Sequence, residues 1–407
     1  MATEDRRLSR RQLLLAYAIG GFGLSMNAQI VLLIPLQARA MGAGFDQVGL
    51  IVGSGSLAAA LSSVALGSLV DRLGPRTCYL LGTGSCAILS AAYIVPSTFW
   101  WFLALQPFLA LSRTLGWVAS QAYISDVGAP SERATHAGRF SFCSNVGQLA
   151  GPLLAGTAAE TVGLRWGLAV PAAYALVFFL LGLRLPNGHR GRGSGRAEAE
   201  QVERASALEL LREPGLRFVL VATFARIWVT IVFTTFLPIL LAERGVGAGL
   251  IGVVMSLMGI VATAAAPMAG PLSRWTGSEA LVATASVGCG AVALVLTPVL
   301  APTWLVFVLP CLVGIGVGLS LPLLMGVVAD STPPSSLGVA MGLRSLANQT
   351  ASTSGPVIIG PMIGALGVAV GFATAGVGAG CVLVAAYAAF ARGRHGFDAP
   401  AGQEKSR

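Results

Sequence analysis

The chain has 407 residues, of which 11% are charged and 55% are hydrophobic. Its mean hydropathy is +0.77. An ordinary soluble domain has about 25% charged residues, so this composition excludes a water-soluble globule and predicts that lipid surrounds most of the chain. Runs such as 30–35 and 291–299 lack the alternation of β-barrel strands. The predicted fold class is therefore an all-α membrane protein.

Twelve apolar segments follow one another, each long enough to cross a bilayer as a helix of about 20 residues. The first six cover 13–36, 47–70, 78–95, 99–125, 138–161 and 165–185. The other six cover 216–242, 247–272, 279–299, 303–329, 338–365 and 367–391. The sequence therefore predicts twelve transmembrane helices in two groups of six.

The polar segment 186–215 separates the two groups. It begins rich in glycine and arginine, and Ser206 with Glu209 then forms a predicted capping box before Pro214 ends the helix. We expect a linker with a short surface helix. The predicted domains are an N-terminal six-helix bundle at 1–185, the linker at 186–215, a C-terminal six-helix bundle at 216–391 and a tail at 392–407.

The two bundles repeat each other in sequence. At an offset of 203 the matched pairs include Pro35 with Pro238, Gly42 with Gly245, Gly67 with Gly270 and Gly74 with Gly277. At an offset of 204 they include Asp126 with Asp330, Gly138 with Gly342 and Gly151-Pro152 with Gly355-Pro356. A register that shifts by a single residue over a whole half predicts two parallel repeats, with the solute site at their interface.

The net charge of +9 comes almost wholly from arginine, because Lys405 is the only lysine. The arginines gather before the first span, in the linker, in the tail and in every second loop, whereas the opposite loops hold only Arg39, Arg165 and Arg244. This is the positive-inside pattern. It argues against nucleic acid as a partner. It predicts a multi-pass protein of the inner membrane with the linker and both termini in the cytoplasm.

A glycine- and charge-containing motif follows the second span. It comprises Gly67, Leu69, Asp71, Arg72, Gly74 and Arg76. This resembles the signature loop of the major facilitator superfamily, although Pro75 replaces a basic residue. The resemblance implies a twelve-helix secondary transporter in which Asp71 docks on the opposite half, near Leu337 and Gly338, and acts as a conformational switch. A carboxylate can accept N–H bonds at a helix N-terminus.

The fifth span carries a second motif of the same family. Gly147, Gly151, Pro152 and Gly156 resemble the motif of antiporters that export drugs and metabolites, with Ala155 as the one departure. The repeat at Gly355-Pro356 shows that part of this signal is structural. We assign conformational switching to this motif, to the signature loop and to Asp126.

Polar residues on three spans are candidates for solute binding. Arg113 lies near the middle of the fourth span, where a charge costs about 2.5–3.5 kcal/mol, and it shares a helical face with Trp117. In the family the resemblance implies, the first, fourth and seventh spans line a central cavity. The candidates are therefore Asn27, Arg113, Trp117, Arg226 and Thr230. Arg113 has an alternative role as a structural arginine bonded to backbone carbonyls.

Titratable groups are scarce within the spans. No Asp or Glu lies deep in one, and the sequence assigns His136, His189 and His395 to loops. We expect a secondary transporter that exports small organic molecules by proton antiport. Uptake or exchange of an organic anion bound by the arginines is an alternative, and a non-transporting membrane sensor is a third. We expect a monomer without enzyme activity or cofactor, whose partners are a small-molecule solute, protons and the bilayer.

The charge asymmetry predicts the side of the membrane on which the linker lies. In a chain whose six native cysteines are replaced, Gly193→Cys should react with a membrane-impermeant maleimide only after the cells are opened. Arg244→Cys, in an opposite loop, is the control and should react in intact cells. Labelling of residue 193 from outside would overturn the predicted topology.

Overall fold

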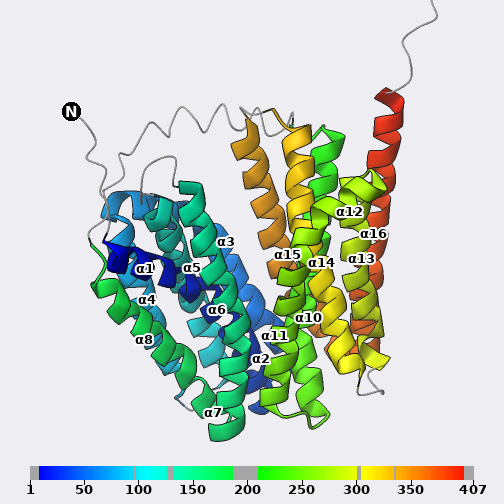
Figure 1. Ribbon diagram of the computed structural model, residues 1–407. Helices are drawn as coiled ribbons and strands as arrows, with labels where there is room; N and C mark the ends of the chain where they lie inside the picture. The colour runs from blue at the N-terminus through cyan, green and yellow to red at the C-terminus, as the bar shows by residue number, and fades with distance from the viewer. Residues whose placement is uncertain are drawn as a thin grey trace, which may run out of the picture.

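The computed structural model describes residues 9–95, 98–125, 133–186, 210–299, 304–333 and 336–397. Within these ranges the regular structure is entirely helical (Figure 1). The first half contains α1 (Arg10–Ala18), α2 (Gly20–Ala40), α3 (Phe45–Leu73), α4 (Pro75–Ala92), α5 (Phe99–Ser125), α6 (Arg133–Val162), α7 (Leu164–Gly167) and α8 (Ala169–Leu183). The second half contains α10 (Pro214–Glu243), α11 (Ala248–Ala265), η1 (Ala266–Met268), α12 (Ala269–Thr276), α13 (Glu279–Leu296), η2 (Thr297–Val299), α14 (Leu305–Ser331), α15 (Leu337–Leu366) and α16 (Val368–Phe397).

The twelve predicted spans correspond to these helices in order. The helix bounds differ from the prediction at Ile19 and at Pro214. The first span divides into α1 and α2 at Ile19. There the ring of Phe140 lies 2.6 Å from where a Cβ on Gly20 would stand, so only glycine permits this approach. Pro214 begins α10 at its first turn rather than ending a helix. The capping box predicted at 206–209 lies outside the described residues.

The surface of the helices is suited to lipid. Among the described residues, nine helices are long and apolar enough to cross a membrane, and α4, α6 and α15 fall outside that set. Large apolar side chains face outward, including Leu61 at 78% exposure and Ile88 at 73%. Such exposure would be unfavourable in water, and the chain is therefore a multi-pass membrane protein.

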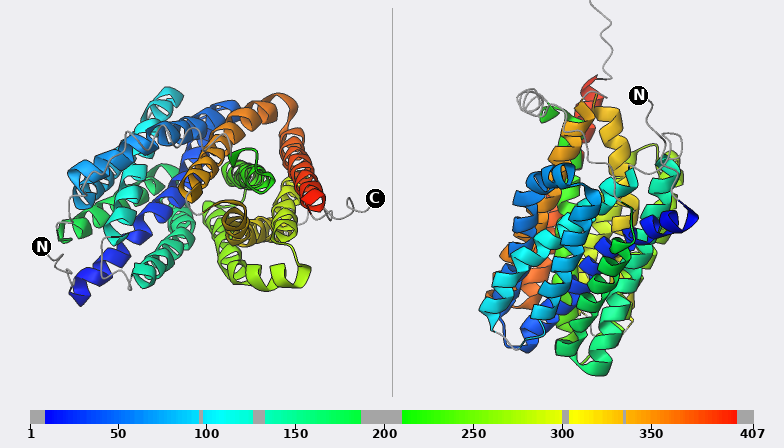
Figure 2. Two further views of the ribbon diagram at one scale, coloured as in Figure 1. Left: turned by 90° about the horizontal axis from the view of Figure 1, so that it is seen from above. Right: turned by 90° about the vertical axis from the view of Figure 1, so that its left-hand side faces the viewer.

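The repeat is visible in the backbone as well as in the sequence. In the described ranges, positive φ angles occur at Gly42, Gly74, Gly163, Gly245, Gly277 and Gly367. These six glycines form three pairs at offsets of 203 and 204. Side chains are strained in that region of φ, which glycine adopts freely. Equivalent turns in the two halves therefore both use a glycine at positive φ, although ψ is 151° at Gly74 and 7° at Gly277. Figure 2 shows the two bundles side by side when the molecule is viewed from above.

The two ends of the molecule differ in how the halves meet. We call the end where α8 finishes and α10 begins the linker end, and the opposite end the distal end. At the distal end α3 packs on α15, and α6 packs on α11. A Cβ on Gly156 of α6 would lie 2.5 Å from the carbonyl oxygen of Ala248, and one on Gly360 of α15 would lie 2.5 Å from that of Phe45. Backbones of opposite halves therefore touch there.

Polar contacts also join the halves at the distal end. The Arg39 Nε atom lies 2.7 Å from Oε1 of Glu243, and the Glu160 carboxylate accepts the N–H of Gly249 at 3.1 Å. At the linker end, by contrast, a Cβ on Gly67, Gly138 or Gly342 would meet no atom within 4 Å. Figure 1 shows the ribbons of the two halves close together at the distal end and diverging toward the linker end.

The close approach of α6 and α11 yields a prediction. Gly156→Ala adds a methyl group against the Ala248 carbonyl and should force the distal ends apart. The control is Gly342→Ala, because its methyl group enters open space. In a cysteine-free chain carrying Met255→Cys, labelling by an impermeant reagent from the distal side should rise at least several-fold with Gly156→Ala and stay unchanged with the control. Equal labelling of both variants would contradict this description of the distal contact.

Candidate functional site

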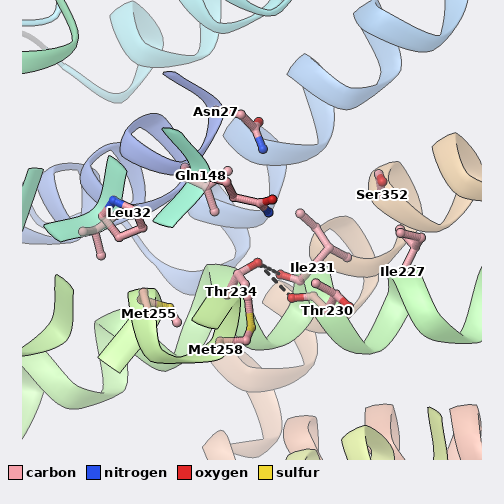
Figure 3. Close-up of a pocket in the computed structure, with 14 residues that line it drawn as sticks. Asn27, Leu32, Gln148, Ile227, Thr230, Ile231, Thr234, Met255, Met258 and Ser352 are labelled. Atoms are coloured by element: carbon pink, nitrogen blue, oxygen red, sulfur yellow. Dashed lines mark hydrogen bonds between the residues drawn. The ribbon is translucent and has the colours of Figure 1, made fainter. Parts of the chain in front are cut away.

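A cavity of about 180 Å³ lies between the two halves (Figure 3). Helices α2 and α6 of the first half and α10, α11 and α15 of the second half line it. The lining residues are Asn27, Ala28, Val31, Leu32, Gln148, Pro152, Ile227, Thr230, Ile231, Thr234, Met255, Met258, Gly259 and Ser352. Its volume is below the ~300–1,000 Å³ of most drug-sized sites, so it suits a compact solute or one part of a larger one.

The α10 wall follows from helical periodicity. Ile227, Thr230, Ile231 and Thr234 are spaced three or four residues apart and therefore share one face. The Thr230 hydroxyl donates to the carbonyl of Arg226 at 2.7 Å, and that of Thr234 donates to the carbonyl of Thr230 at 2.8 Å. Both hydroxyl hydrogens are thus satisfied within the helix, and the oxygen lone pairs can accept a bond from a solute.

Two amides provide the polar groups of the first half. Asn27 of α2 and Gln148 of α6 point toward the space in front of α10 (Figure 3). Within the described ranges, neither side chain makes a hydrogen bond. Each amide group has two N–H donors and a carbonyl oxygen that accepts. They can therefore bind polar groups of a solute from the side opposite Thr230 and Thr234.

Apart from Ser352, the rest of the lining is apolar. Met255 and Met258 of α11 contribute flexible thioethers, which adapt to irregular shapes. None of the lining residues is acidic or basic. The cavity itself therefore fits an uncharged or apolar group that forms a few hydrogen bonds.

The candidate binding residues predicted from the sequence lie at different distances from this cavity. Asn27 and Thr230 line it, whereas Arg113, Trp117 and Arg226 are not among its lining residues. Trp117 packs against Gly23 of α2 and against the Phe140 ring, with centroids 5.9 Å apart. It therefore lies behind the α2 wall.

Arg113 lies inside the first half. It is half-buried on α5, near Cys86 of α4 and Tyr93, which follows that helix. Gln106 lies two turns before Arg113 on α5. Its Oε1 atom accepts a hydrogen bond from the Tyr93 hydroxyl at 2.9 Å. The polar stripe predicted on this helix exists, but it faces neighbouring helices of its own bundle.

The predicted switch residues of the signature motif lie at the junction of α3 and α4. Asp71 and Arg72 are exposed in the last turn of α3, so most of the predicted loop is helical. Gly74 forms the turn with φ of 88°. Arg76 donates to the carbonyl of Leu183 at 2.9 Å and so ties α4 to the end of α8. Space around Gly67 is open.

The second predicted switch motif places glycines where helices cross. A Cβ on Gly151 would lie 2.7 Å from the carbonyl oxygen of Ser25 on α2, and Pro152 lines the cavity. Gly156 faces α11 on the other side. The motif thus lets α6 pack closely between α2 of its own half and α11 of the other. Asp126, the remaining predicted switch residue, lies outside the described residues.

One titratable residue was assigned wrongly from the sequence. His136 belongs to α6, which begins at Arg133, and it is 7% exposed rather than in a loop. Its Nδ1 atom lies 2.6 Å from the hydroxyl of Tyr17 on α1, and Arg139 donates to that hydroxyl at 3.4 Å. The spacing of His136, Arg139 and Phe140 on one helical face was the available signal. The predicted span began at residue 138 and missed it.

Comparisons with known proteins agree with this architecture. The model of the Major Facilitator Superfamily matches residues 13–356 and 219–407. The class C tetracycline resistance protein of Escherichia coli is 24% identical over 309 residues, which cover 74% of this chain and 75% of that protein. Solute carrier family 22 member 18 of Mus musculus is 28% identical over 181 residues, and the match covers only 42% of each protein.

Further similarity is found to another resistance protein and to solved structures. The multidrug resistance protein MdtG of Citrobacter koseri is 27% identical over 245 residues, or 59% of each protein. The crystal structure of the nucleoside transporter NupG superposes with a TM-score of 0.76 at 14% identity, covering 94% of this chain and 98% of that one. An inward-facing, unoccupied bacterial homologue of Spinster gives 0.71 at 18% identity, covering 97% and 98%.

The structural likenesses establish the fold, and the family model matches most of the sequence. With its two repeated helical bundles and the cavity between them, the chain belongs to the major facilitator superfamily of membrane transporters.

Proposed function

We propose that this protein exports small organic molecules in exchange for protons by alternating access. The observation that carries the proposal is the cavity shared by both halves, each of which packs as a helical bundle of its own. Rocking of two repeats around a site between them moves a solute across a bilayer.

The direction of transport rests on two observations. The motif at Gly147–Gly156 resembles that of exporting antiporters, and two relatives bear the names of a tetracycline and a multidrug resistance protein. The arginine distribution supports a cytoplasmic linker end. In that orientation the halves are joined on the outer side, and a solute would enter from the cytoplasm.

Proton coupling requires a group that gains and loses a proton during the cycle. We propose His136 for this role, because it is buried on α6 beside Tyr17 of α1 and Arg139. Helix α1 leads directly into α2, which lines the cavity.

We assign Asp71 to conformational switching. Asp71 is exposed at the end of α3, on the linker-end side, and would dock on the opposite half when the linker ends close. Asp71→Asn should therefore slow transport while solute affinity stays near the wild-type value. A variant that transports at the wild-type rate would remove this role.

Proteoliposomes test the proposed function. A panel of solutes that includes tetracycline is added to vesicles that contain the purified protein and a trapped pH-sensitive dye. The pH of the vesicle lumen should change only when the added solute is transported. His136→Gln keeps a hydrogen-bonding side chain but removes the imidazole, and it should abolish proton flux while solute exchange persists. Tyr17→Phe, the control, keeps the imidazole and should retain proton flux. Solute movement without proton flux in the wild type would contradict antiport.

The cavity amides generate a prediction about affinity. Asn27→Leu and Gln148→Leu each remove one bond to the solute, worth about 1 kcal/mol, and should weaken binding roughly five-fold. Thr161→Val, on the same helix as Gln148 but exposed, is the control and should leave binding unchanged. Isothermal titration with a solute identified in the vesicle screen measures the difference. Equal affinity in all three variants would show that the solute binds elsewhere.

A further inference from the structure

Two arginines of the second half lie on neighbouring helices near the cavity. Arg226 of α10 and Arg344 of α15 are both half-buried, and α10 packs along α15. The Nε atom of each is buried and has no hydrogen-bond partner among the described residues. The ion pair found in the described ranges joins Arg39 and Glu243 at the distal end, far along the helices from both. Neither guanidinium is thus paired with a carboxylate of the described part of the chain.

The electrostatic environment of this pair is unfavourable as it stands. Burial disfavours the charge of Arg226, and the charge of Arg344 repels it as well. Withdrawing two like charges from water without an acidic partner is costly in a membrane protein. A negative group placed between them would relieve the repulsion and satisfy the unpartnered N–H groups.

The position of the pair connects it to the cavity. Arg226 precedes Thr230 by one helical turn, about 6 Å along the axis, and Arg344 precedes Ser352 by two turns. Both helices run from the linker end, so both arginines lie on the linker-end side of Thr230 and Ser352, which line the cavity. Two parallel stripes, each beginning with an arginine and continuing with hydroxyls, therefore lead into the same space.

We propose that Arg226 and Arg344 together bind an oxyanion, a carboxylate or phosphate group, at the linker end of the cavity. The planar donors of guanidinium match such groups in bidentate geometry. The apolar part of the same molecule lies against Met255 and Met258. The transported solutes are therefore amphiphilic organic anions. This assignment of substrate class rests on the proposed transport function, whereas the anion site itself does not.

Octanoate and its neutral analogue octanamide test the site. Full-length protein in phosphatidylcholine nanodiscs should bind octanoate at least ten-fold more tightly than octanamide in isothermal titration. Arg226→Gln and Arg344→Gln should each weaken octanoate binding about ten-fold and leave octanamide binding unchanged, which also shows that the variants are folded. Arg217→Gln is the matched control, because Arg217 is exposed on the same helix. Equal binding of both probes, or equal loss with Arg217→Gln, would overturn the proposal.

A lipid headgroup offers the same chemistry as a free solute. Repeating the titration in phosphatidylglycerol nanodiscs separates the two sources. Unchanged octanoate affinity supports a solute site. If phosphatidylglycerol weakens octanoate binding to the wild type but not to Arg226→Gln, the lipid headgroup occupies the site and the assignment to solutes is overturned. Vesicle assays distinguish the two proposals: transport of neutral solutes without octanoate binding would refute the anion site alone. Octanoate binding without transport of any solute would refute the proposed function alone.

Discussion

The structure depends on close contact between helix backbones at the distal end. Gly156 and Gly360 allow carbonyl groups of the opposite half to approach where any side chain would intrude. Such contacts are strong enough to hold two bundles together in lipid, where apolar burial contributes little to helix association. Side chains of Leu149 and Val357 also fit against glycines of the opposite half. The proposed transport cycle would break and remake these contacts while each bundle keeps its own packing.

The helices could be predicted because lipid imposes one simple rule on sequence. A segment that crosses the bilayer must be apolar and helical over about 20 residues, and the predicted span 99–125 has the same bounds as α5. The rule does not specify local packing. The break at Ile19 adjoins Gly20, which packs on the Phe140 ring of another helix, and the early start of α6 places polar His136 beside Tyr17. Neither partner is adjacent in sequence.

The cavity could be predicted only in part, for a related reason. Periodicity shows which residues share a face, but it does not show which neighbour that face meets. On α10 the predicted face includes Thr230 and does line the cavity, whereas on α5 the face with Arg113 and Trp117 meets its own bundle. Gln148 and the two methionines of α11 were missed because an isolated amide and apolar residues give no signal of function in a membrane helix.

The three pairs of positive-φ glycines lie at turns, whereas the helix faces between these turns carry the side chains that can vary. At each of these turns a glycine at positive φ redirects the chain toward the next helix. The faces between the turns can therefore change independently in the two halves, as the equivalent positions Asp71 and Arg274 do by carrying opposite charges. A scaffold defined by so few positions can acquire a new cargo by altering the lining of one half, while the course of the chain is inherited unchanged.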